Sequence, residues 1–517
     1  MIELKRELKK VVEDEKDENK NKTTLVMSGH RKKPFSHKQK KSQLAEKKLK
    51  KQNSNPYEDL HTAPAATKKL VSQFDKLNTA QVIMKREEAM RQLSVLPKEA
   101  LEVSFDEIYP DEQIIAIPKR PEWNYAMSKE ELEKSEQESF DKWMTSIYEL
   151  YDKEELSYFE KNIEVWRQLW RVVEISDIII IVVDIRNPIF HFNPSLYHFI
   201  IEMKKIPLVV FMKVDLVSPE IYTAWEEYFS LKFPELKFAA CSIYASENNC
   251  FKRKRYDCST GIKELLCKLQ DISIPFTDSA AQWKYLIDQR QGIKSSEKIN
   301  DSGRLVTVGL IGHPNVGKSS LINSIVGKKV CSASRSPGHT KHFQTIHLSP
   351  SIRLCDCPGL VLPSVISKSV QILSGIFPIA QVRDPYHPLI FAAERIPLAT
   401  ILNVGTSEDN PFLSAWGICE ELAIKKGFYT AKGARPDVYR AANLILRTIV
   451  DGKIVVCWKP KGFYQQHVNF VESFTATSNF TESVEIESSE YSLEESEEGE
   501  EESNSASNPF DLLLESE

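Results

Sequence analysis

Short apolar runs alternate with amphipathic stretches through the middle of the 517-residue chain. The apolar runs have the length and content of strands buried on both faces of a sheet, and they occupy residues 177–183, 207–212, 236–241, 305–310 and 352–355. Stretches with helical length and spacing lie before and between them, at residues 166–176, 193–204, 224–231 and from 261 onward. This alternation predicts an α/β fold built on a parallel sheet with helices on both faces.

The sequence on either side of this alternation is different in character. Residues 128–158 and 436–450 are expected to be helical, because they combine helix formers with spaced apolar side chains. Residues 453–458 are expected to form a strand, and the polar stretch 271–303 a loop. The sequence thereby separates into a basic and largely disordered arm (1–60), a helical region (61–165), the α/β domain (166–364), a mostly helical C-terminal domain (365–468) and an acidic disordered tail (469–517).

The net charge of −5 conceals a strong asymmetry between the two ends of the protein. Residues 27–54 carry ten Lys or Arg and one Glu, whereas residues 471–517 carry fifteen Asp or Glu and neither Lys nor Arg. The basic segment indicates a nuclear or nucleolar address or a contact with RNA phosphates, with a merely solvated tail as the alternative. The apolar runs are too short to cross a bilayer, so no membrane partner is expected.

The most informative stretch is LVTVGLIGHPNVGKSS, residues 305–320, which matches G-x-x-x-x-G-K-[ST] between a predicted strand and a predicted helix. Such a loop points backbone N–H groups at phosphate oxygens, and the helix N-terminus adds a positive partial charge. Lys318 is expected to reach the β and γ phosphates, and the Ser319 hydroxyl to bind Mg²⁺. The expected nucleotide contacts in this loop are Gly312, His313, Pro314, Asn315, Val316, Gly317, Lys318, Ser319 and Ser320.

A second phosphate motif, D-x-x-G, follows the last apolar run as Asp356, Cys357, Pro358 and Gly359. In this motif the Asp holds Mg²⁺ through water and the Gly N–H meets the γ-phosphate. Thr340 is the expected switch residue that closes on Mg²⁺ and the γ-phosphate, with Ser334 and Ser336 as alternatives.

The residue after this motif, Leu360, stands where many small GTPases place a Gln that orients water. An aliphatic side chain cannot orient water, so slow intrinsic hydrolysis is expected. Asn315 is a candidate ligand for K⁺ beside the phosphates, and His339 is a weaker candidate for assisting the reaction.

A base-reading motif follows the second apolar run as Met212, Lys213, Val214 and Asp215. The usual pattern is Asn-Lys-x-Asp, in which the Asp accepts hydrogen bonds from guanine N1–H and the 2-amino group, which adenine lacks. Met212 replaces the Asn, so weaker base affinity is expected, while Asp215 preserves the preference for guanine. Ser242 is the candidate for the loop that meets guanine O6.

The motifs occur in the order base motif, phosphate loop, Thr340 and D-x-x-G, whereas ordinary GTPases begin with the phosphate loop and end with the base motif. This permuted order, together with WRQLWRVVEISDIIIIVVDIRNP, GHPNVGKSSLIN, SRSPGHTKHFQT and DCPGL, resembles the circularly permuted YlqF/YawG GTPases. The resemblance implies a circularly permuted P-loop GTPase domain that binds and hydrolyses GTP with Mg²⁺. It also implies a role in ribosome assembly in the nucleolus, nucleus or cytoplasm.

Three functions are compatible with the sequence. The first is a slow GTPase switch acting on a preribosomal or ribosomal particle of RNA and protein. The second is a nucleotide-binding scaffold with a degenerate G domain and little GTPase activity. The third is an ATPase, which would require that Met212 marks a lost guanine site.

Overall fold

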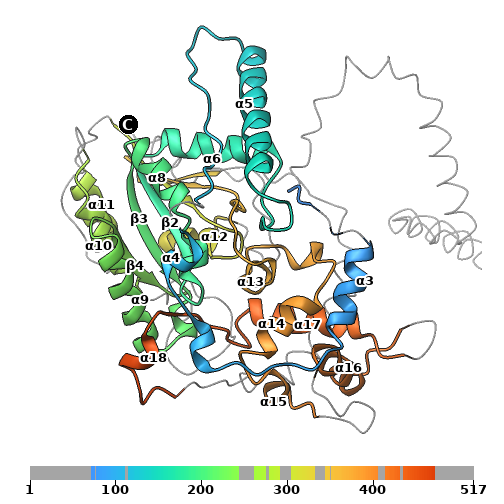
Figure 1. The fold of residues 1–517 in the computed structure, drawn as a ribbon. Coiled ribbons are helices and arrows are strands. Elements are labelled where there is room, and N and C mark those ends of the chain that lie inside the picture. The colour runs from blue at the N-terminus through green and yellow to red at the C-terminus, as the bar shows by residue number, and fades with distance from the viewer. Residues whose placement is uncertain are drawn as a thin grey trace, which may run out of the picture. The chain divides into compact units, whose positions relative to one another are not determined.

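The structure is a computed structural model, and it describes residues 72–75, 77, 79–110, 114–243, 261–274, 279–290, 304–331, 344–349, 351–405, 414–430 and 435–471. Two units make up the protein, residues 1–68 and 69–517, and every described residue belongs to the second (Figure 1). The basic segment, the acidic tail beyond residue 471 and Thr340 lie outside the described residues. The predictions made for them stay predictions.

A six-stranded sheet in the order β4-β3-β2-β5-β7-β6 forms the centre of the described residues. Its strands are β2 (Ile178–Asp184), β3 (Ile206–Met212), β4 (Lys237–Cys241), β5 (Val306–Ile311), β6 (Gln344–Ser349) and β7 (Ile352–Asp356). The five predicted strands are present and pair in parallel, which confirms the predicted fold class. The edge strand β6 was not predicted and runs antiparallel to β7, so the sheet is mixed. Its half-exposed, partly polar sequence QTIHLS lacks the apolar run that marked the other strands.

Helices pack around this sheet and occur throughout both flanking regions. The α-helices are α3 (Thr79–Glu88), α4 (Phe105–Ile108), α5 (Lys129–Leu150), α6 (Ile163–Ile175), α7 (Pro188–His191), α8 (Pro194–Glu202), α9 (Pro219–Lys232), α10 (Ile262–Gln270), α11 (Ser279–Arg290), α12 (Lys318–Val326), α13 (Lys368–Leu373), α14 (Tyr386–Ala393), α15 (Leu398–Leu402), α16 (Ala415–Lys426), α17 (Val438–Val450) and α18 (Phe463–Gln466). Short 3₁₀ helices cover Lys98–Leu101, Val214–Leu216 and Ile379–Gln381. No helix among the described residues has both the length and the apolar content needed to cross a bilayer.

Two local predictions were wrong. The stretch 271–303 contains the helix α11, in which Trp283 and Ile287, four residues apart, are buried in the core beside α10. The stretch 453–458 is not a strand, because the backbone N–H groups of Lys453 and Ile454 bond back to the carbonyl of Thr448 in α17. Only β8 (Lys459–Pro460), immediately after it, is extended and paired, in parallel with β1 (Glu102–Val103).

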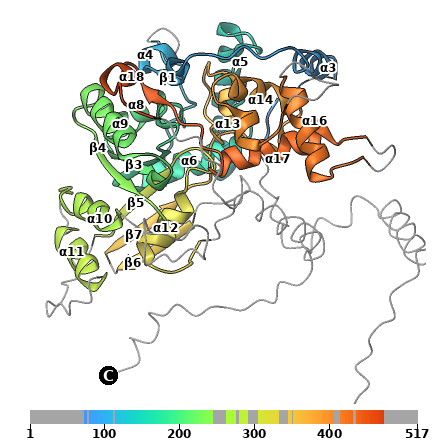
Figure 2. The ribbon, with the colours of Figure 1, turned by 90° about the horizontal axis from the view of Figure 1, so that it is seen from below.

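The alternation of side chains along each strand creates two cores, one on each face of the sheet. Ile178, Ile180 and Val182 of β2 belong to a core completed by α10, α11 and α12. Ile179 and Ile181, on the opposite face, belong to a larger core that includes side chains of α6, α8, α9 and of the helices α13–α17 (Figure 2). Residues 365–468 therefore share a hydrophobic core with the α/β domain.

A buried carboxylate joins the long helix α5 to the elements around it. Glu136 of α5 is 2% exposed, and its two oxygens lie 2.7 Å from Arg120 Nε and 2.7 Å from Arg167 Nε. Arg167 lies on α6, and Arg120 lies in the extended segment that precedes α5. One carboxylate thus bridges two guanidinium groups, each of which has one further carboxylate partner, Glu174 for Arg120 and Glu164 for Arg167.

Glu136→Ala is expected to lower the free energy of unfolding by about 3 kcal/mol, because it removes the buried carboxylate that bridges Arg120 and Arg167 and leaves each with a single, more exposed partner. The matched control is Glu138→Ala on the same helix, whose carboxylate is 59% exposed and pairs only with Lys134. That variant should change stability by less than about 0.5 kcal/mol. Urea unfolding followed by circular dichroism measures both, and equal stabilities for the two variants would contradict the role assigned to Glu136.

Candidate nucleotide-binding site

The predicted phosphate loop lies at the carboxyl end of β5, in the middle of the sheet, and leads into α12. Gly312, Asn315 and Gly317 have positive φ angles of 146°, 58° and 109°. A Cβ at Gly312 would lie 2.6 Å from the carbonyl oxygen of Val182, so only glycine fits there. The loop therefore has the backbone of a phosphate cradle, followed by a helix N-terminus at Lys318.

Lys318 folds back over this loop and is buried. Its Nζ donates hydrogen bonds to the carbonyl oxygens of Gly312, at 3.0 Å, and His313, at 2.6 Å. Burial lowers the pKa of Lys318 to about 8, and the nearby carboxylate of Asp356 offsets only part of that effect. The buried ammonium group is thus only partly neutralised by its surroundings, and the oxygens of a phosphate chain would supply the missing negative charge.

Ser319 and Asp356 are brought together although 37 residues separate them. The Ser319 Oγ donates a hydrogen bond of 2.8 Å to Asp356 Oδ2. Asp356 Oδ1 is buried and accepts no hydrogen bond from any residue that the structure describes, and burial raises the pKa of this carboxyl. An orphaned carboxylate oxygen beside a hydroxyl matches the all-oxygen ligands that Mg²⁺ prefers.

The D-x-x-G segment packs directly on the phosphate loop. The Cys357 N–H donates to the carbonyl of Leu310, at 3.2 Å, and the Leu360 N–H to that of Gly312, at 3.3 Å. A Cβ at Gly359 would lie 2.8 Å from Pro314 Cα, so the two backbones are in close contact. The Leu360 side chain is buried in the core and offers no polar group to water.

The base-reading residues gather at the carboxyl ends of β3 and β4. Asp215 lies in the 3₁₀ turn after β3, together with Val214, and its Oδ1 accepts a hydrogen bond from Ser242, which follows β4. Lys213 adopts a left-handed conformation with a φ of 62°, and its Nζ lies 2.7 Å from Asp184 Oδ2. The structure thus places Asp215 and Ser242 in contact, and their interaction with guanine stays a prediction.

Met212 is 1% exposed and lies beneath the phosphate loop. A Cβ at Gly317 would lie 3.4 Å from Met212 Cε, so the thioether fills the space under the second glycine of the loop. Its effect on base affinity stays a prediction. Asn315 donates from Nδ2 to the carbonyl of Gly375, at 3.2 Å, which links the phosphate loop to the C-terminal region. Its amide oxygen is the atom that would bind K⁺.

The remaining residues predicted to contact the nucleotide belong to the phosphate loop and the D-x-x-G segment. Val316 is buried in the core beneath the loop, Ser320 is buried in the first turn of α12, and Pro358 stands between Cys357 and Gly359. His313 is buried, and its ring centroid lies 5.8 Å from that of His191 in α7. Burial lowers the pKa of both imidazoles, that of His191 to about 4, so both are neutral at pH 7.

Sequence reasoning missed the buried charges beside the base motif. Asp184 ends the strand β2 and Arg186 follows it, and both are at most 1% exposed. The Arg186 Nη2 lies 2.7 Å from Asp184 Oδ2, the same oxygen that Lys213 approaches. The available signal was the polar sequence DIRNP directly after six apolar residues, at the sheet edge where ligands bind in α/β folds.

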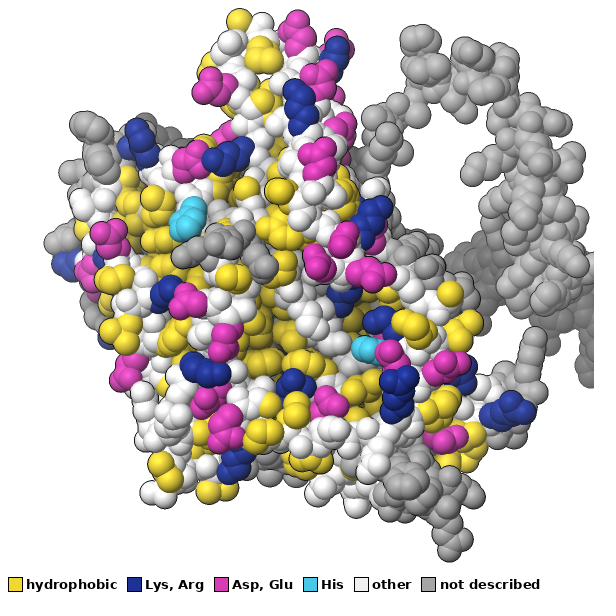
Figure 3. Space-filling model, in the orientation of Figure 1, with side chains coloured by type: hydrophobic (Ala, Val, Ile, Leu, Met, Phe, Trp, Pro, Cys, Tyr) yellow, Lys and Arg dark blue, Asp and Glu magenta, His cyan; other side chains and the backbone are white. Residues whose placement is uncertain are grey.

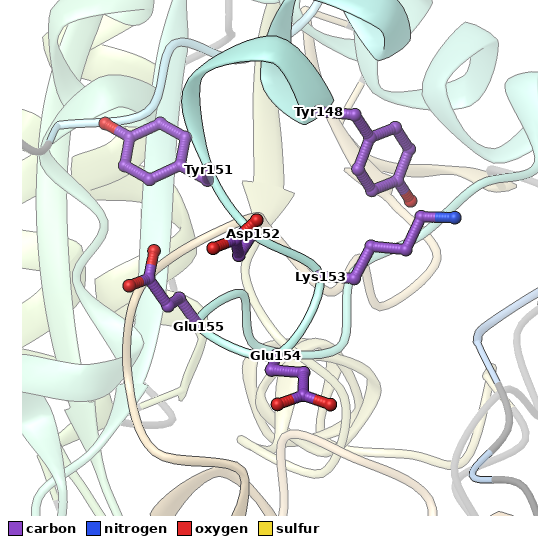
Figure 4. A pocket seen from close by; sticks show the side chains of 6 residues that line it. All are labelled: Tyr148, Tyr151, Asp152, Lys153, Glu154 and Glu155. Carbon is purple, nitrogen blue, oxygen red and sulfur yellow. The ribbon is translucent and has the colours of Figure 1, made fainter.

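A separate hollow of about 600 Å³ lies at the end of α5 (Figure 4). It is lined by Tyr148, Tyr151, Asp152, Lys153, Glu154 and Glu155. None of these belongs to a nucleotide motif, and acidic side chains also mark the exposed surface of α5 (Figure 3). Lys368, eight residues after Leu360, donates hydrogen bonds to the carbonyls of Lys153 and Glu154, so the hollow borders the segment that follows D-x-x-G.

The lowered pKa of Lys318 predicts that nucleotide binding takes up protons. The free protein loses the Lys318 proton near pH 8, whereas bound phosphates would hold it to higher pH. Affinity should therefore fall above pH 8, by up to about tenfold per pH unit. Calorimetric titration with GDP at pH 8, in two buffers of different ionisation enthalpy, should show uptake of about half a proton. Binding without proton uptake would contradict this electrostatic description of the loop.

Gly359→Ala should separate D-x-x-G from the phosphate loop, because the added methyl group meets the Pro314 backbone at 2.8 Å. Single-turnover GTP hydrolysis is expected to slow by about 100-fold, the scale of a misplacement near 1 Å. GDP affinity should change less, since GDP lacks the γ-phosphate. Gly405→Ala is the control, since a Cβ there meets nothing within 4 Å. Equal hydrolysis by the two variants would rule out the contact as a requirement.

Comparison with known proteins agrees with this site. A family model described as a 50S ribosome-binding GTPase matches residues 307–385. Guanine nucleotide-binding protein-like 1 of Mus musculus is 37% identical over 440 residues, which cover 75% of this chain and 72% of the relative. Large subunit GTPase 1 of Schizosaccharomyces pombe is 36% identical over 371 residues, which cover 68% of this chain and 59% of the relative.

The crystal structure of GNP-bound YlqF from T. maritima is a more distant match, with 17% identity, a TM-score of 0.33, and coverage of 56% of this chain and 94% of that one. A likeness this weak carries no part of the assignment. The human guanine nucleotide-binding protein-like 1 is also 37% identical, over 442 residues, and within the permuted family this is the protein that the sequence motifs resemble. The chain belongs to the YlqF/YawG family of circularly permuted GTPases, alongside guanine nucleotide-binding protein-like 1, and it is a GTP-binding P-loop GTPase.

Proposed function

We propose that this GTPase is a slow conformational switch that acts on a ribosomal or preribosomal particle. The observation that carries the proposal is that the segment after D-x-x-G is hydrogen-bonded to residues that precede the α/β domain. Ser157 N–H donates to the carbonyl of Ser364, at 2.9 Å, and Glu160 N–H to that of Val361, at 3.0 Å. The side chain of Gln371, in α13, exchanges two hydrogen bonds with the backbone of Tyr158. A change at the γ-phosphate therefore reaches both flanking regions.

The ribosomal partner is inferred from similar proteins. The matching family model is described as ribosome-binding, and one relative is named for the large subunit. The segment with ten Lys or Arg at residues 27–54 would bind RNA phosphates and would direct the protein to the nucleus and nucleolus, with a cytoplasmic pool. The proposal thus gives the GTPase a cellular location and a particle on which it acts.

The chemistry within the site divides among few side chains. Lys318 would neutralise charge on the β and γ oxygens, and Asp215 would accept the guanine N1–H. Ser319 and Asp356 would hold Mg²⁺, joined by Thr340 when the switch closes, and Mg²⁺ would neutralise the triphosphate. Asn315 would place K⁺ beside the same oxygens. Because Leu360 is buried and aliphatic, the unassisted rate should be of order 10⁻⁴ per second.

Single-turnover GTP hydrolysis tests this proposal directly. The isolated protein should hydrolyse GTP slowly in sodium, faster in potassium, and at least about tenfold faster again with ribosomal subunits present. Asn315→Ala should remove the difference between potassium and sodium, because it deletes the side-chain oxygen that is the proposed cation ligand. Fast hydrolysis in sodium alone, unaffected by subunits, would overturn the assisted-switch mechanism.

Deleting residues 27–54 provides the second arm of the test. The truncated protein should retain wild-type GTP affinity but lose salt-sensitive association with subunits and enrichment in the nucleus. Binding of GTP with hydrolysis that no particle stimulates would instead favour a nucleotide-binding scaffold with little GTPase activity.

A further inference from the structure

The base-motif lysine is attached to the C-terminal region through two buried side chains. Lys213 Nζ and Arg186 Nη2 both lie 2.7 Å from Asp184 Oδ2, and Arg186 Nε donates to Asp184 Oδ1 at 3.1 Å. The carboxylate is fully buried and the guanidinium is 1% exposed. Burial alone would raise the pKa of Asp184, but Arg186 and then Lys213 hold it well below its ordinary value, so the carboxylate stays charged.

The far side of Arg186 ends on the last turn of α17, more than 260 residues further along the sequence. Its Nη1 donates to the carbonyl of Ile449, at 2.9 Å, and its Nη2 to that of Val450, at 3.0 Å. These carbonyls lie at a helix C-terminus, where the helix dipole favours a cation, and that of Ile449 also accepts from the Gly452 N–H, at 3.0 Å. One nitrogen, Nη2, therefore contacts both the carboxylate that holds Lys213 and the end of α17.

A second contact joins the same two places. Gly452, in the turn after α17, has a φ of 79°, and a Cβ there would lie 2.6 Å from Leu216 Cδ1 and 3.5 Å from Arg186 Nη1. Leu216 is the neighbour of Asp215 in the 3₁₀ turn of the base motif. The end of α17 thus meets the base motif both through Arg186 and through Leu216.

We propose that Arg186 is a positioning residue that fixes Lys213 through Asp184, so that guanine-nucleotide affinity depends on the docking of α17. If α17 moves away, Arg186 Nη2 loses the Val450 carbonyl and the shared carboxylate loses its anchor. Lys213 then no longer has a fixed direction across the base site. This coupling acts on the base, and it is separate from the contact of the phosphate loop with Gly375. It requires only that the protein binds guanine nucleotides, and it is independent of the ribosomal partner.

The test uses substitutions at the α17 end of this chain of contacts, outside the sequences of the base motif and the phosphate loop. Gly452→Ala places a methyl group 2.6 Å from Leu216 Cδ1 and so displaces the turn after α17 against the base motif, beside Arg186 Nη1. Gly427→Ala places the same methyl group at a left-handed glycine after α16 with nothing within 4 Å. Arg186→Lys keeps the positive charge but loses the planar fork that reaches carboxylate and carbonyls together. The full-length protein is used throughout, with binding of fluorescent GDP, single-turnover GTP hydrolysis, and the unfolding midpoint without nucleotide as readouts.

Gly452→Ala is expected to bind GDP about fivefold more weakly than Gly427→Ala, the scale of one lost hydrogen bond. Arg186→Lys should weaken GDP binding to a similar extent. The double variant should lose less affinity than the product of the two single fold-losses, because both substitutions act on the same contacts between α17 and Lys213. The GTP concentration for half-maximal hydrolysis should rise, while the rate at saturating GTP stays that of Gly427→Ala, because the phosphate site is intact.

Three results would overturn the proposal. The first is equal GDP affinity for Gly452→Ala and Gly427→Ala. The second is a double variant whose loss equals the product of the single losses, since this would show that Arg186 and Gly452 act independently. The third is a lowered unfolding midpoint with unchanged GDP affinity in both Arg186→Lys and Gly452→Ala, which would make the contact only structural.

Discussion

The parallel pairing of β2 with β5 is the constraint on which the nucleotide site depends. β2 belongs to the half of the sheet that carries the base-reading residues, and β5 carries the phosphate loop. More than 120 residues separate these strands, yet Ile178 to Ile181 lie in register with Val308 to Ile311. Without this pairing the two halves of the site would have no common edge, because each half of the sheet continues away from this junction.

The permuted order of the motifs changes which part of the chain follows D-x-x-G. The D-x-x-G motif is followed at once by a segment bonded to residues 157–160 and then by α13–α17. The C-terminal helices share a core with one face of the sheet, so they are not attached by a free linker. The same region also contacts the phosphate loop, through Gly375 and Asn315, and its helix α17 contacts Arg186, which lies beside the base motif.

Buried charge is concentrated where these elements meet. Asp184, Arg186, Lys318 and Asp356 are each at most 7% exposed, which is costly unless charges are paired or await a ligand. Asp184 is fully compensated by Arg186 and Lys213, whereas Asp356 Oδ1 and Lys318 are not compensated to the same degree. Asp184 with its two cationic partners therefore stabilises the fold. Asp356 and Lys318 carry charge that a bound cation and a bound nucleotide would neutralise.

The sequence alone determined the local parts of this protein. Buried strands appear in it as apolar runs, and the phosphate loop needs glycines at fixed spacing for its backbone angles, so five strands and both phosphate motifs were predictable. Only the tertiary structure decided the antiparallel β6, the helix α11, the burial of Met212 and the partners of Lys213 and Arg186. Those features depend on contacts between residues far apart in the sequence, such as Arg186 and Val450, and no local pattern of side chains encodes such a contact.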